Sequence, residues 1–366
     1  MRKHSPDWVF LGLLVVILVF GLAVLSSAST PIAKLKFNDP YFYLKHQIKY
    51  GLILGIIGFF FGYSFYYLKL KKFSLILFLL NLILLILIFS PLGVTQKGAR
   101  RWLNFFGIWF QPAQLLKLTF FLYLSTWLSL REKEKSRSFK KGYLPFLVIC
   151  GTIGFLLIKE PATSFCALIL LSALILYFLA GARFSFIALT FFLILIALGV
   201  AIILAPYRMQ RVITFLNPDF DPQGASYQIN QSLIAIGSGG WFGKGFGNSV
   251  LKRKFLPEVI SDSIFAIICE EFGFIGAIGF LVLYLLFVFR IFKIAKKAPC
   301  NFGKYFCFSV GIVFWLETVI HLSSNLGLLP FCGLGLPLVS YGGTSLAVYL
   351  TLLGLVAGIS KFTLNS

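Results

Sequence analysis

Residues 73–91 read FSLILFLLNLILLILIFSP and contain no charged side chain. About 20 mainly apolar residues are long enough to cross the hydrocarbon core of a bilayer as a helix. In lipid the backbone of such a stretch must satisfy its own hydrogen bonds, which a helix does and an open strand does not. The segment therefore predicts a transmembrane helix.

Nine further runs of this kind occur, so the sequence predicts an all-α polytopic membrane protein, with one transmembrane domain over residues 1–366. The predicted spans cover residues 8–28, 48–67, 73–91, 111–130, 143–159, 162–180, 184–205, 262–290, 304–327 and 343–360. Only Lys159-Glu160-Pro161 separates the fifth from the sixth, which predicts a tight hairpin. The first run also resembles a signal peptide that ends near Ser26, but its apolar part is long for one, which favours a retained helix.

The composition excludes a water-soluble globular protein. Of 366 residues, 59% are hydrophobic and 12% are charged, and the mean hydropathy is +0.92. Soluble domains carry about 25% charged residues, so a chain with far fewer cannot cover a water-facing surface. Six cysteines form no CxxC pair, which predicts buried thiols rather than a disulfide framework or a zinc site.

The charge distribution predicts both an orientation and an anionic ligand. Basic residues of short loops mark the cytoplasmic side, and a slight majority of them places the N-terminus there. The opposite loops are also basic, with Lys97, Arg100, Arg101, Arg208, Arg211, Lys252, Arg253 and Lys254. A net charge of +21 needs a negative partner, and the hydropathy favours anionic or pyrophosphate-bearing lipids over nucleic acid.

One long loop, residues 206–261, separates the seventh and eighth predicted spans. It is rich in Gly, Pro, Asn and Asp, which predicts a segment that is irregular rather than helical throughout. Loops longer than about 15 residues in a compact fold are usually functional or disordered. Trp241, Phe242, Phe246 and Phe255 make this loop too apolar for disorder, so we expect a folded, site-forming loop on the outer leaflet.

Asp262 and Lys117 are the leading ionisable candidates, because charged groups in or beside a span are expensive to bury. Asp262 opens the eighth span directly after the cations at 252–254. A carboxylate there can act as a general base or hold a metal, and Ser261 or Asp262 could equally cap the helix. Lys117 lies inside the fourth span, either snorkelling to the interface or contacting a pyrophosphate.

Other polar groups permit two interpretations each. Glu270 and Glu271 lie about two turns below Asp262, so one can share its helix face while the other pairs within the bundle. Glu317 and His321 are four residues apart in the ninth predicted span, so their side chains can touch, either as a structural pair or as a proton relay. Arg100-Arg101-Trp102 is an interfacial anchor or a phosphate contact, and the glycines at 239–247 are flexible turns or a phosphate nest.

Four blocks of sequence carry a family resemblance. They are Gly98-Ala99-Arg100-Arg101-Trp102 with Gln111-Pro112 and Lys117; Asn217-Pro218 through Tyr227-Gln228 and Gln231-Ser232 to Trp241-Phe242-Gly243; Leu256-Pro257-Glu258 with Asp262 and Glu270-Glu271-Phe272-Gly273; and Gly327-Leu328-Leu329-Pro330 with Leu336-Pro337-Leu338-Val339-Ser340-Tyr341-Gly342-Gly343. In this order they resemble the shape, elongation, division and sporulation (SEDS) family of cell-wall glycosyltransferases. The resemblance runs almost end to end, and Gly247-Asn248-Ser249-Val250 is closer to the division branch than to the elongation branch.

The resemblance implies polymerisation of lipid II, with Asp262 as the catalytic aspartate. It also implies a set of substrate-binding residues, which are Arg101, Lys117, Glu258, Lys252, Arg253, Lys254, Gln228, Gln231, Ser232 and Ser340. No cofactor is required by the sequence, although a divalent cation, Mg²⁺ or Mn²⁺, fits such chemistry. The implied partners are a class B penicillin-binding protein and other division proteins in the bacterial inner membrane, with both termini of this chain cytoplasmic.

Several positions depart from the family pattern. Gln114 stands where the family usually has a glutamate, and Ala162 replaces the acid of its Pro-Asp-Leu-Gly-Thr block. Ile260 replaces a histidine, and His321 and Ser323 replace an asparagine and a glycine. These changes bear on pKa tuning and metal binding more than on the reaction. Two other functions stay open: a lipid II flippase, which predicts essential charges near the midplane, and a non-catalytic scaffold for the transpeptidase.

Overall fold

Every predicted apolar run forms a helix in the computed structural model, which describes residues 4–96, 98–105, 107–130, 138–217, 221, 224, 226–253 and 256–363. The helices over these runs are α1 (Trp8–Phe37), α2 (Phe42–Gln47) continued by the π-helix Ile48–Leu52 and α3 (Ile53–Ser64), α4 (Tyr67–Leu87), α5 (Pro112–Ser129), the π-helix Phe139–Tyr143 continued by α7 (Leu144–Lys159), α8 (Thr163–Leu179), α9 (Phe184–Ile203), α12 (Ile264–Lys297), α13 (Asn301–Asn325) and α14 (Gly343–Ser360). Over the described residues, eight helical stretches are long and apolar enough to cross a membrane. The chain is therefore a multi-pass membrane protein, and the all-α prediction is confirmed.

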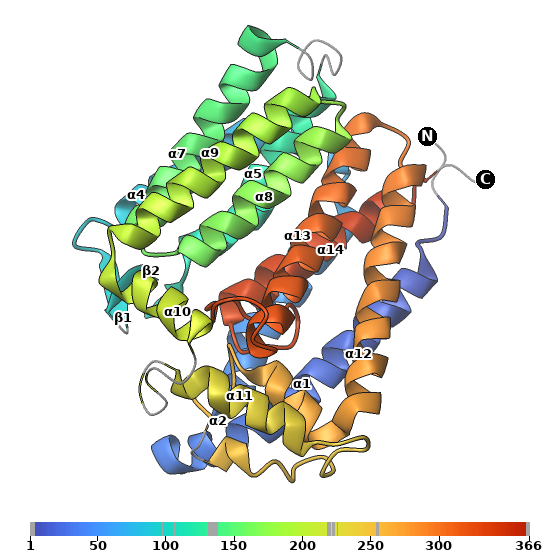
Figure 1. The fold of residues 1–366 in the computed structure, drawn as a ribbon. Helices are drawn as coiled ribbons and strands as arrows, with labels where there is room; N and C mark the ends of the chain where they lie inside the picture. Colours follow the sequence, from blue (N-terminus) through green and yellow to red (C-terminus); the bar gives the residue numbers. More distant parts are fainter. Residues whose placement is uncertain are drawn as a thin grey trace.

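The helices gather around two hydrophobic cores that meet at α13 (Figure 1). One core joins α1, α12 and α14, and the other joins α4, α5, α7 and α8. Phe314 of α13 belongs to the first core, whereas its neighbours Ile312 and Val313 belong to the second. Apolar residues all round α13 allow it to be buried on both sides, and the outer helices keep large apolar side chains exposed on their outer faces, as lipid requires.

Helix α3 packs closely on α14 through glycines. A Cβ atom on Gly62 would lie 2.8 Å from the backbone nitrogen of Leu355, and one on Gly354 would overlap the backbone of Phe59. Apolar burial does not drive helices together in lipid, so small residues that let backbones approach are a main source of association.

Helix α1 extends to Phe37, well past the predicted end at residue 28. Phe10, Ile17 and Val24 on one of its faces are fully buried in the first core. The helix is thus an integral part of the bundle, which agrees with a retained span rather than a signal peptide.

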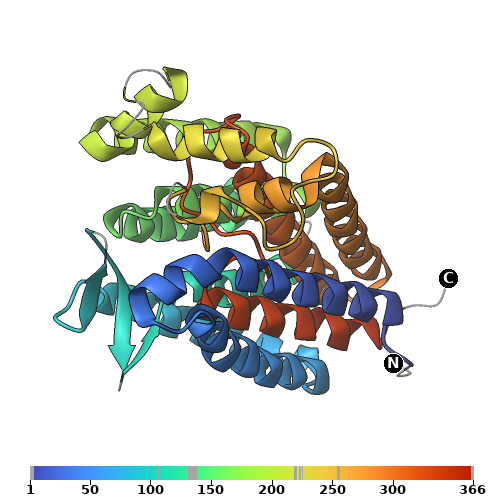
Figure 2. The same ribbon diagram turned by 90° about the horizontal axis from the view of Figure 1, so that it is seen from below.

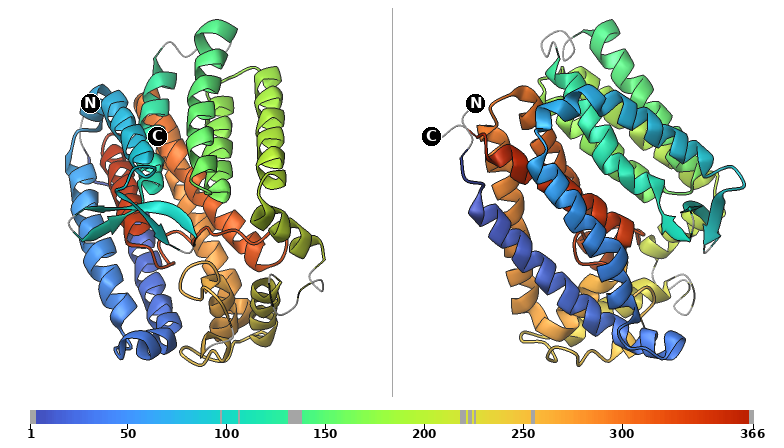
Figure 3. Two further views of the ribbon diagram at one scale, coloured as in Figure 1. Left: turned by 90° about the vertical axis from the view of Figure 1, so that its left-hand side faces the viewer. Right: turned by 180° about the vertical axis from the view of Figure 1, so that it is seen from behind.

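A small antiparallel sheet, which the sequence analysis did not predict, precedes α5. Its strands β1 (Gly93–Gln96), β2 (Ala99–Phe105) and β3 (Ile108–Phe110) pair in the order β1-β2-β3. The turns between them use Gly98 and Gly107, both with positive φ. Arg101 and Trp102 therefore lie on a strand that pairs with its neighbours on both sides, in the small sheet that Figure 3 shows.

The long loop 206–261 is only partly irregular. It contains α10 (Pro206–Leu216), α11 (Tyr227–Ser238) and a short 3-10 turn at Leu251–Arg253. Helix α11 packs on α12, as the view from this end shows (Figure 2). Both chain termini lie at the opposite end of the bundle (Figure 1).

Candidate active site

Asp262 lies in a tight turn directly before α12. The backbone carbonyl of Glu258 accepts hydrogen bonds from the N–H groups of Ser261, Asp262 and Ser263 at 3.1, 3.1 and 3.2 Å. Glu258 itself has a φ of 48°, an uncommon conformation for a residue with a side chain. The turn is therefore wound around one carbonyl, which fixes the backbone of Asp262.

Two other segments hold the same turn from outside. Asn325 of α13 donates one hydrogen bond from Nδ2 to the carbonyl oxygen of Asp262, at 2.9 Å. Ser340, in the loop before α14, donates from Oγ to the carbonyl oxygen of Ser261, at 2.6 Å. Segments distant in sequence thus converge on the backbone of the aspartate, and its half-buried side chain projects from a rigid support.

Asp262 does not cap α12. The N-cap position is Ser263, whose side chain makes no capping bond. Its Oγ instead donates to the carbonyl of Pro257 at 3.0 Å and accepts from Nε2 of Gln228 at 3.2 Å. The N-cap interpretation of Asp262 is therefore wrong, and Gln228 of α11 acts in this structure by holding the turn.

The Asp262 carboxylate lies beside the loop before α14. A Cβ atom on Gly333 would lie 3.5 Å from Oδ2 of Asp262, so this loop passes at van der Waals distance. Burial lowers the pKa of the Arg101 guanidinium, whereas Glu160 and Asp262 act to raise it, which shows that both carboxyl groups lie near Arg101. Arg211 also acts on Arg101, so two guanidinium groups and Asp262 share one region.

The backbone of the hairpin turn between α7 and α8 holds Arg101 in place. Its Nε donates to the carbonyl oxygen of Glu160 at 3.2 Å, and its Nη2 donates to that of Pro161. The Glu160 side chain is 1% exposed, and burial raises its pKa to about 8 although Arg101 acts to lower it. Its Oε1 accepts no hydrogen bond from the described residues. Sequence reasoning used Glu160 only as a hairpin marker; an acid between two spans was the available signal.

A small pocket of about 60 Å³ lies next to the turn that carries Asp262, between α10, α11 and the loop before α14. Its lining is Arg211, Thr214, Phe215, Gln228, Ile229 and Phe331. Arg211 donates from Nη1 to the carbonyl oxygen of Phe331 at 3.3 Å. Gln228 also donates a hydrogen bond to Ser263, the residue after Asp262, so one residue connects the pocket lining to the turn that carries Asp262. In the sequence alone, Arg211 stood out only as one of the basic residues of the outer loops.

Lys117 lies elsewhere, in the bundle interior. Its Nζ is 2.6 Å from Oε2 of Glu317 and 4.4 Å from the ring centre of Tyr349, whose hydroxyl donates to Glu317. The lysine is 1% exposed, so the snorkelling interpretation is wrong. The expected Glu317–His321 pair is also wrong, because Nδ1 of His321 contacts the carbonyl oxygen of Leu334 instead, at 2.7 Å.

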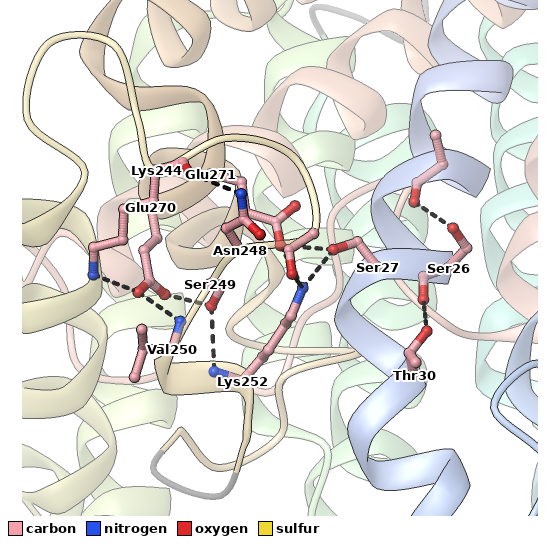
Figure 4. A network of polar contacts seen from close by, with 12 residues as sticks. Ser26, Ser27, Thr30, Lys244, Asn248, Ser249, Val250, Lys252, Glu270 and Glu271 are labelled. Carbon is pink, nitrogen blue, oxygen red and sulfur yellow. Dashed lines mark hydrogen bonds and ion pairs between the residues drawn. The ribbon is translucent and has the colours of Figure 1, made fainter.

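The two glutamates below Asp262 belong to a closed network (Figure 4). Glu270 pairs with Lys244 at 2.7 Å and accepts a hydrogen bond from Ser249. Glu271 pairs with Lys252 at 2.7 Å and accepts from Ser27 of α1 at 2.6 Å, both at Oε1. Its buried Oε2 accepts no hydrogen bond from the described residues. Lys252 is 4% exposed. A residue predicted to bind substrate therefore stands in a buried ion pair that fastens the loop to α12.

The glycine-rich stretch is docked on α12 rather than open for phosphate. The N–H groups of Lys244 and Gly245 donate to the carbonyls of Glu270 and Glu271 at 2.9 and 3.0 Å. They can do so because α12 is interrupted at Gly273, which has φ 68° and ψ −169°. At these positions the nest interpretation is wrong.

The remaining predicted residues are divided between the turn and the surface. The Oε2 of Glu258 accepts from Ser261 Oγ at 3.2 Å, and Ser232 donates to the carbonyl of Gln228 at 2.9 Å. Gln231 is half-buried on α11 and Arg253 is exposed, while Lys254 lies outside the described residues. Over the part of the chain that is described, no group of three or more His, Cys, Asp or Glu can hold a metal ion.

Comparison with known proteins gives a consistent result over the whole chain. A family model described as "Cell cycle protein", covering FtsW, RodA and SpoVE, matches residues 7–365. A "Probable peptidoglycan glycosyltransferase FtsW" of Geobacter sp. (strain M18) is 35% identical over 98% of this chain and 98% of the relative. Stage V sporulation protein E of Bacillus subtilis (strain 168) is 34% identical over 99% of each chain. The resemblance found in the sequence is confirmed.

Solved structures agree. A chain of a structure described as "Structural coordination of polymerization and crosslinking by a peptidoglycan synthase complex" has a TM-score of 0.79 and 28% identity, covering 98% of both chains. The rod shape determining protein RodA of Thermus thermophilus has a TM-score of 0.71 and 24% identity, covering 99% of both chains. The second likeness shows the fold alone.

Proposed function

The chain belongs to the FtsW, RodA and SpoVE family of cell cycle proteins, and from this premise we propose that it is a peptidoglycan glycosyltransferase that polymerises lipid II during cell division. The observation that carries the proposal is the placement of Asp262. Its backbone is fixed from Glu258, Asn325 and the Ser340 loop, while its carboxylate lies beside arginine side chains near a pocket. Relatives described as FtsW favour the division branch.

The proposed reaction joins two lipid-linked disaccharides. The 4-hydroxyl of one sugar attacks the anomeric carbon of the other, the bond to the lipid pyrophosphate breaks, and the pyrophosphate leaves with the electron pair. Asp262 accepts the proton of the attacking hydroxyl, a role that contributes typically 10²–10⁴-fold. A rigid support suits a general base, because the carboxylate needs no reorganisation as the bond forms.

Arg101 and Arg211 would stabilise the departing pyrophosphate. Negative charge develops on its oxygens as the glycosidic bond breaks, and preorganised cations at that point lower the barrier. Guanidinium groups match phosphate oxygens with paired hydrogen bonds. Glu160 and Asp262 both act on Arg101. In the proposed reaction Asp262 takes the proton and the guanidinium groups meet the developing charge, and a divalent cation, Mg²⁺ or Mn²⁺, would share in neutralising the pyrophosphate.

Lys117 and Lys252 have no direct part in this proposal. Both ammonium groups are held by buried carboxylates, Glu317 and Glu271, and either ion pair would have to open before a pyrophosphate could bind. The proposed substrate contacts are those at the turn and at α11, with Glu258, Gln231 and Arg253 nearest to solvent.

The proposed orientation places both termini in the cytoplasm and loop 206–261 outside. The opposite positions of the termini and the loop along the bundle support it (Figure 1). We also propose a class B penicillin-binding protein as the partner, since the chain most similar in fold among those compared above comes from a structure described as a synthase complex for polymerization and crosslinking.

The test is lipid II polymerisation by the purified protein, alone and with its cognate transpeptidase, beside Asp262→Ala. The parent should make glycan strands, and the variant should be slower by about 10²–10⁴-fold. Equal rates for parent and variant would remove Asp262 from the reaction. Transport of labelled lipid II across vesicles without glycan synthesis would favour a flippase, and neither activity would favour a scaffold.

A further inference from the structure

A second cavity lies at the other end of the bundle from Asp262, where both termini meet. It measures about 360 Å³ and is bounded by residues 4–9, the last turns of α12 and the end of α14. Figure 3 shows the start of α1 beside the end of α12 at this position. Nothing in the proposed glycosyl transfer uses it, so an explanation for its shape and charge must come from its own lining.

The wall that α12 contributes is strongly basic. Arg290, Lys293 and Lys297 follow at helical spacing, so they share one face, and all three line the cavity. Among the described residues of the lining, Asp7 is the one carboxylate, and Nε of Arg290 is 2.7 Å from its Oδ2. Lys293 and Lys297 bring two further positive charges, which makes the cavity suited to an anion.

The opposite wall is fixed rather than frayed. The backbone N–H of His4 donates to the carbonyl of Lys361 at 2.9 Å, and that of Asp7 donates to Oγ of Ser360 at 3.1 Å. Asp7 in turn accepts a hydrogen bond from the N–H of Phe10 at 3.0 Å, which caps α1. The N-terminal segment is thus bound to the end of α14, and the cavity is a formed site between three elements.

Exposed apolar surface continues directly from the basic wall. Trp8 at the start of α1 is 69% exposed, and Phe289, one residue before Arg290, is 66% exposed. Further along the same two helices Val16 and Leu286 are exposed as well. Cations at the membrane boundary with apolar surface below them match a molecule that has a phosphate at one end and acyl chains at the other. A free phosphate would contact only the basic wall of the cavity and would leave the apolar surface uncovered.

We propose that this cavity binds the headgroup phosphate of an anionic phospholipid from the leaflet on the side of the termini. Arg290, Lys293 and Lys297 contact the phosphate oxygens, and the acyl chains lie along α1 and α12. The bound lipid joins the N-terminal segment, α12 and α14, so it stabilises the end of the bundle. The proposal is independent of the reaction at Asp262.

The experiment uses the full chain, purified in detergent and stripped of lipid, with phosphatidylglycerol, phosphatidylcholine or inorganic phosphate added. Bound lipid is counted by native mass spectrometry, and the unfolding temperature is followed in parallel. The test variant is Lys293→Gln/Lys297→Gln. The matched control is Lys69→Gln/Lys72→Gln, which removes two exposed lysines of α4 that do not line the cavity, and Lys293→Arg/Lys297→Arg keeps the charge.

Phosphatidylglycerol should bind and stabilise the parent, the control and the arginine variant, whereas the test variant should need roughly tenfold to thirtyfold more lipid for the same effect. Phosphatidylcholine should do neither. Equal binding by the test and control variants would overturn the proposal, as would equal stabilisation by phosphatidylcholine. Full stabilisation by inorganic phosphate would show that the cavity binds a free anion, and it would overturn the proposal that the ligand is a phospholipid.

Discussion

Residues 262–271 contain three carboxylates in two different settings. Glu270 and Glu271 are fully buried and paired with Lys244 and Lys252, so their charges serve to fasten the loop and α1 to α12. Asp262 is half-buried, and hydrogen bonds to its backbone from Asn325 and to the carbonyl of Glu258 help to position it. A carboxylate that is held in a buried ion pair maintains structure, whereas a half-buried one that is carried on a turn beside a pocket can meet a substrate.

The largest effect that would test this contrast is loss of the buried pair. Lys252→Met leaves the Glu271 carboxylate buried without its cation, which costs about 3–5 kcal/mol of folding free energy. The unfolding temperature should fall accordingly. Arg253→Met, an exposed neighbour in the same turn, is the control and should unfold like the parent. If the two variants were equally stable, the network would not hold the loop.

A second effect concerns the protonation of Glu160, at the edge of the candidate site. Burial raises the pKa of Glu160 from 4.5 to about 8, so the folded protein keeps a proton that the unfolded chain releases. The contribution of Glu160 to stability should therefore be greatest below pH 4.5 and should decline as the pH rises to about 8. Glu160→Gln, which cannot ionise, should flatten this part of the profile. Thermal unfolding across that pH range measures it, and a parallel decline in both proteins would contradict the assignment.

A smaller effect separates positioning from substrate contact at Ser340. Its hydroxyl donates to Ser261 and accepts from the N–H of Leu336, at 2.6 and 2.7 Å. Ser340→Ala should loosen the turn and lower kcat for polymerisation about tenfold, roughly 1.4 kcal/mol in the barrier, with little change in KM. A raised KM with unchanged kcat would instead mark Ser340 as a direct substrate contact.

The spans could be predicted from sequence because the bilayer leaves few alternatives. An uncharged run such as 73–91 has to be a helix, and α4 covers residues 67–87. The sheet at 93–110 escaped prediction because its strands are short, and only Gly98 and Gly107 signalled its turns. Helices α10 and α11 escaped because the composition of the whole loop masked two short helical segments.

The central residue of the candidate site could be predicted from the sequence, but the contacts among its charged residues could not. Asp262 followed from its position at a boundary and from the family resemblance. The partners of Lys117 and Lys252 lie 200 and 19 residues away, and spacing along one helix gives no information about contacts between helices. Glu160 and Arg211 were visible as charged residues, yet their nearness to Arg101 depends on how α7, α10 and β2 pack.

One paired measurement tests the account most directly: the rate of lipid II polymerisation per folded molecule for Asp262→Asn and Glu271→Gln. We expect Asp262→Asn to unfold at the parent's temperature but to lose about 10²-fold or more in rate. Glu271→Gln should unfold at a lower temperature, while its folded fraction stays within a few-fold of the parent rate. A folded but inactive Glu271→Gln, or an active Asp262→Asn, would contradict the division of roles along α12.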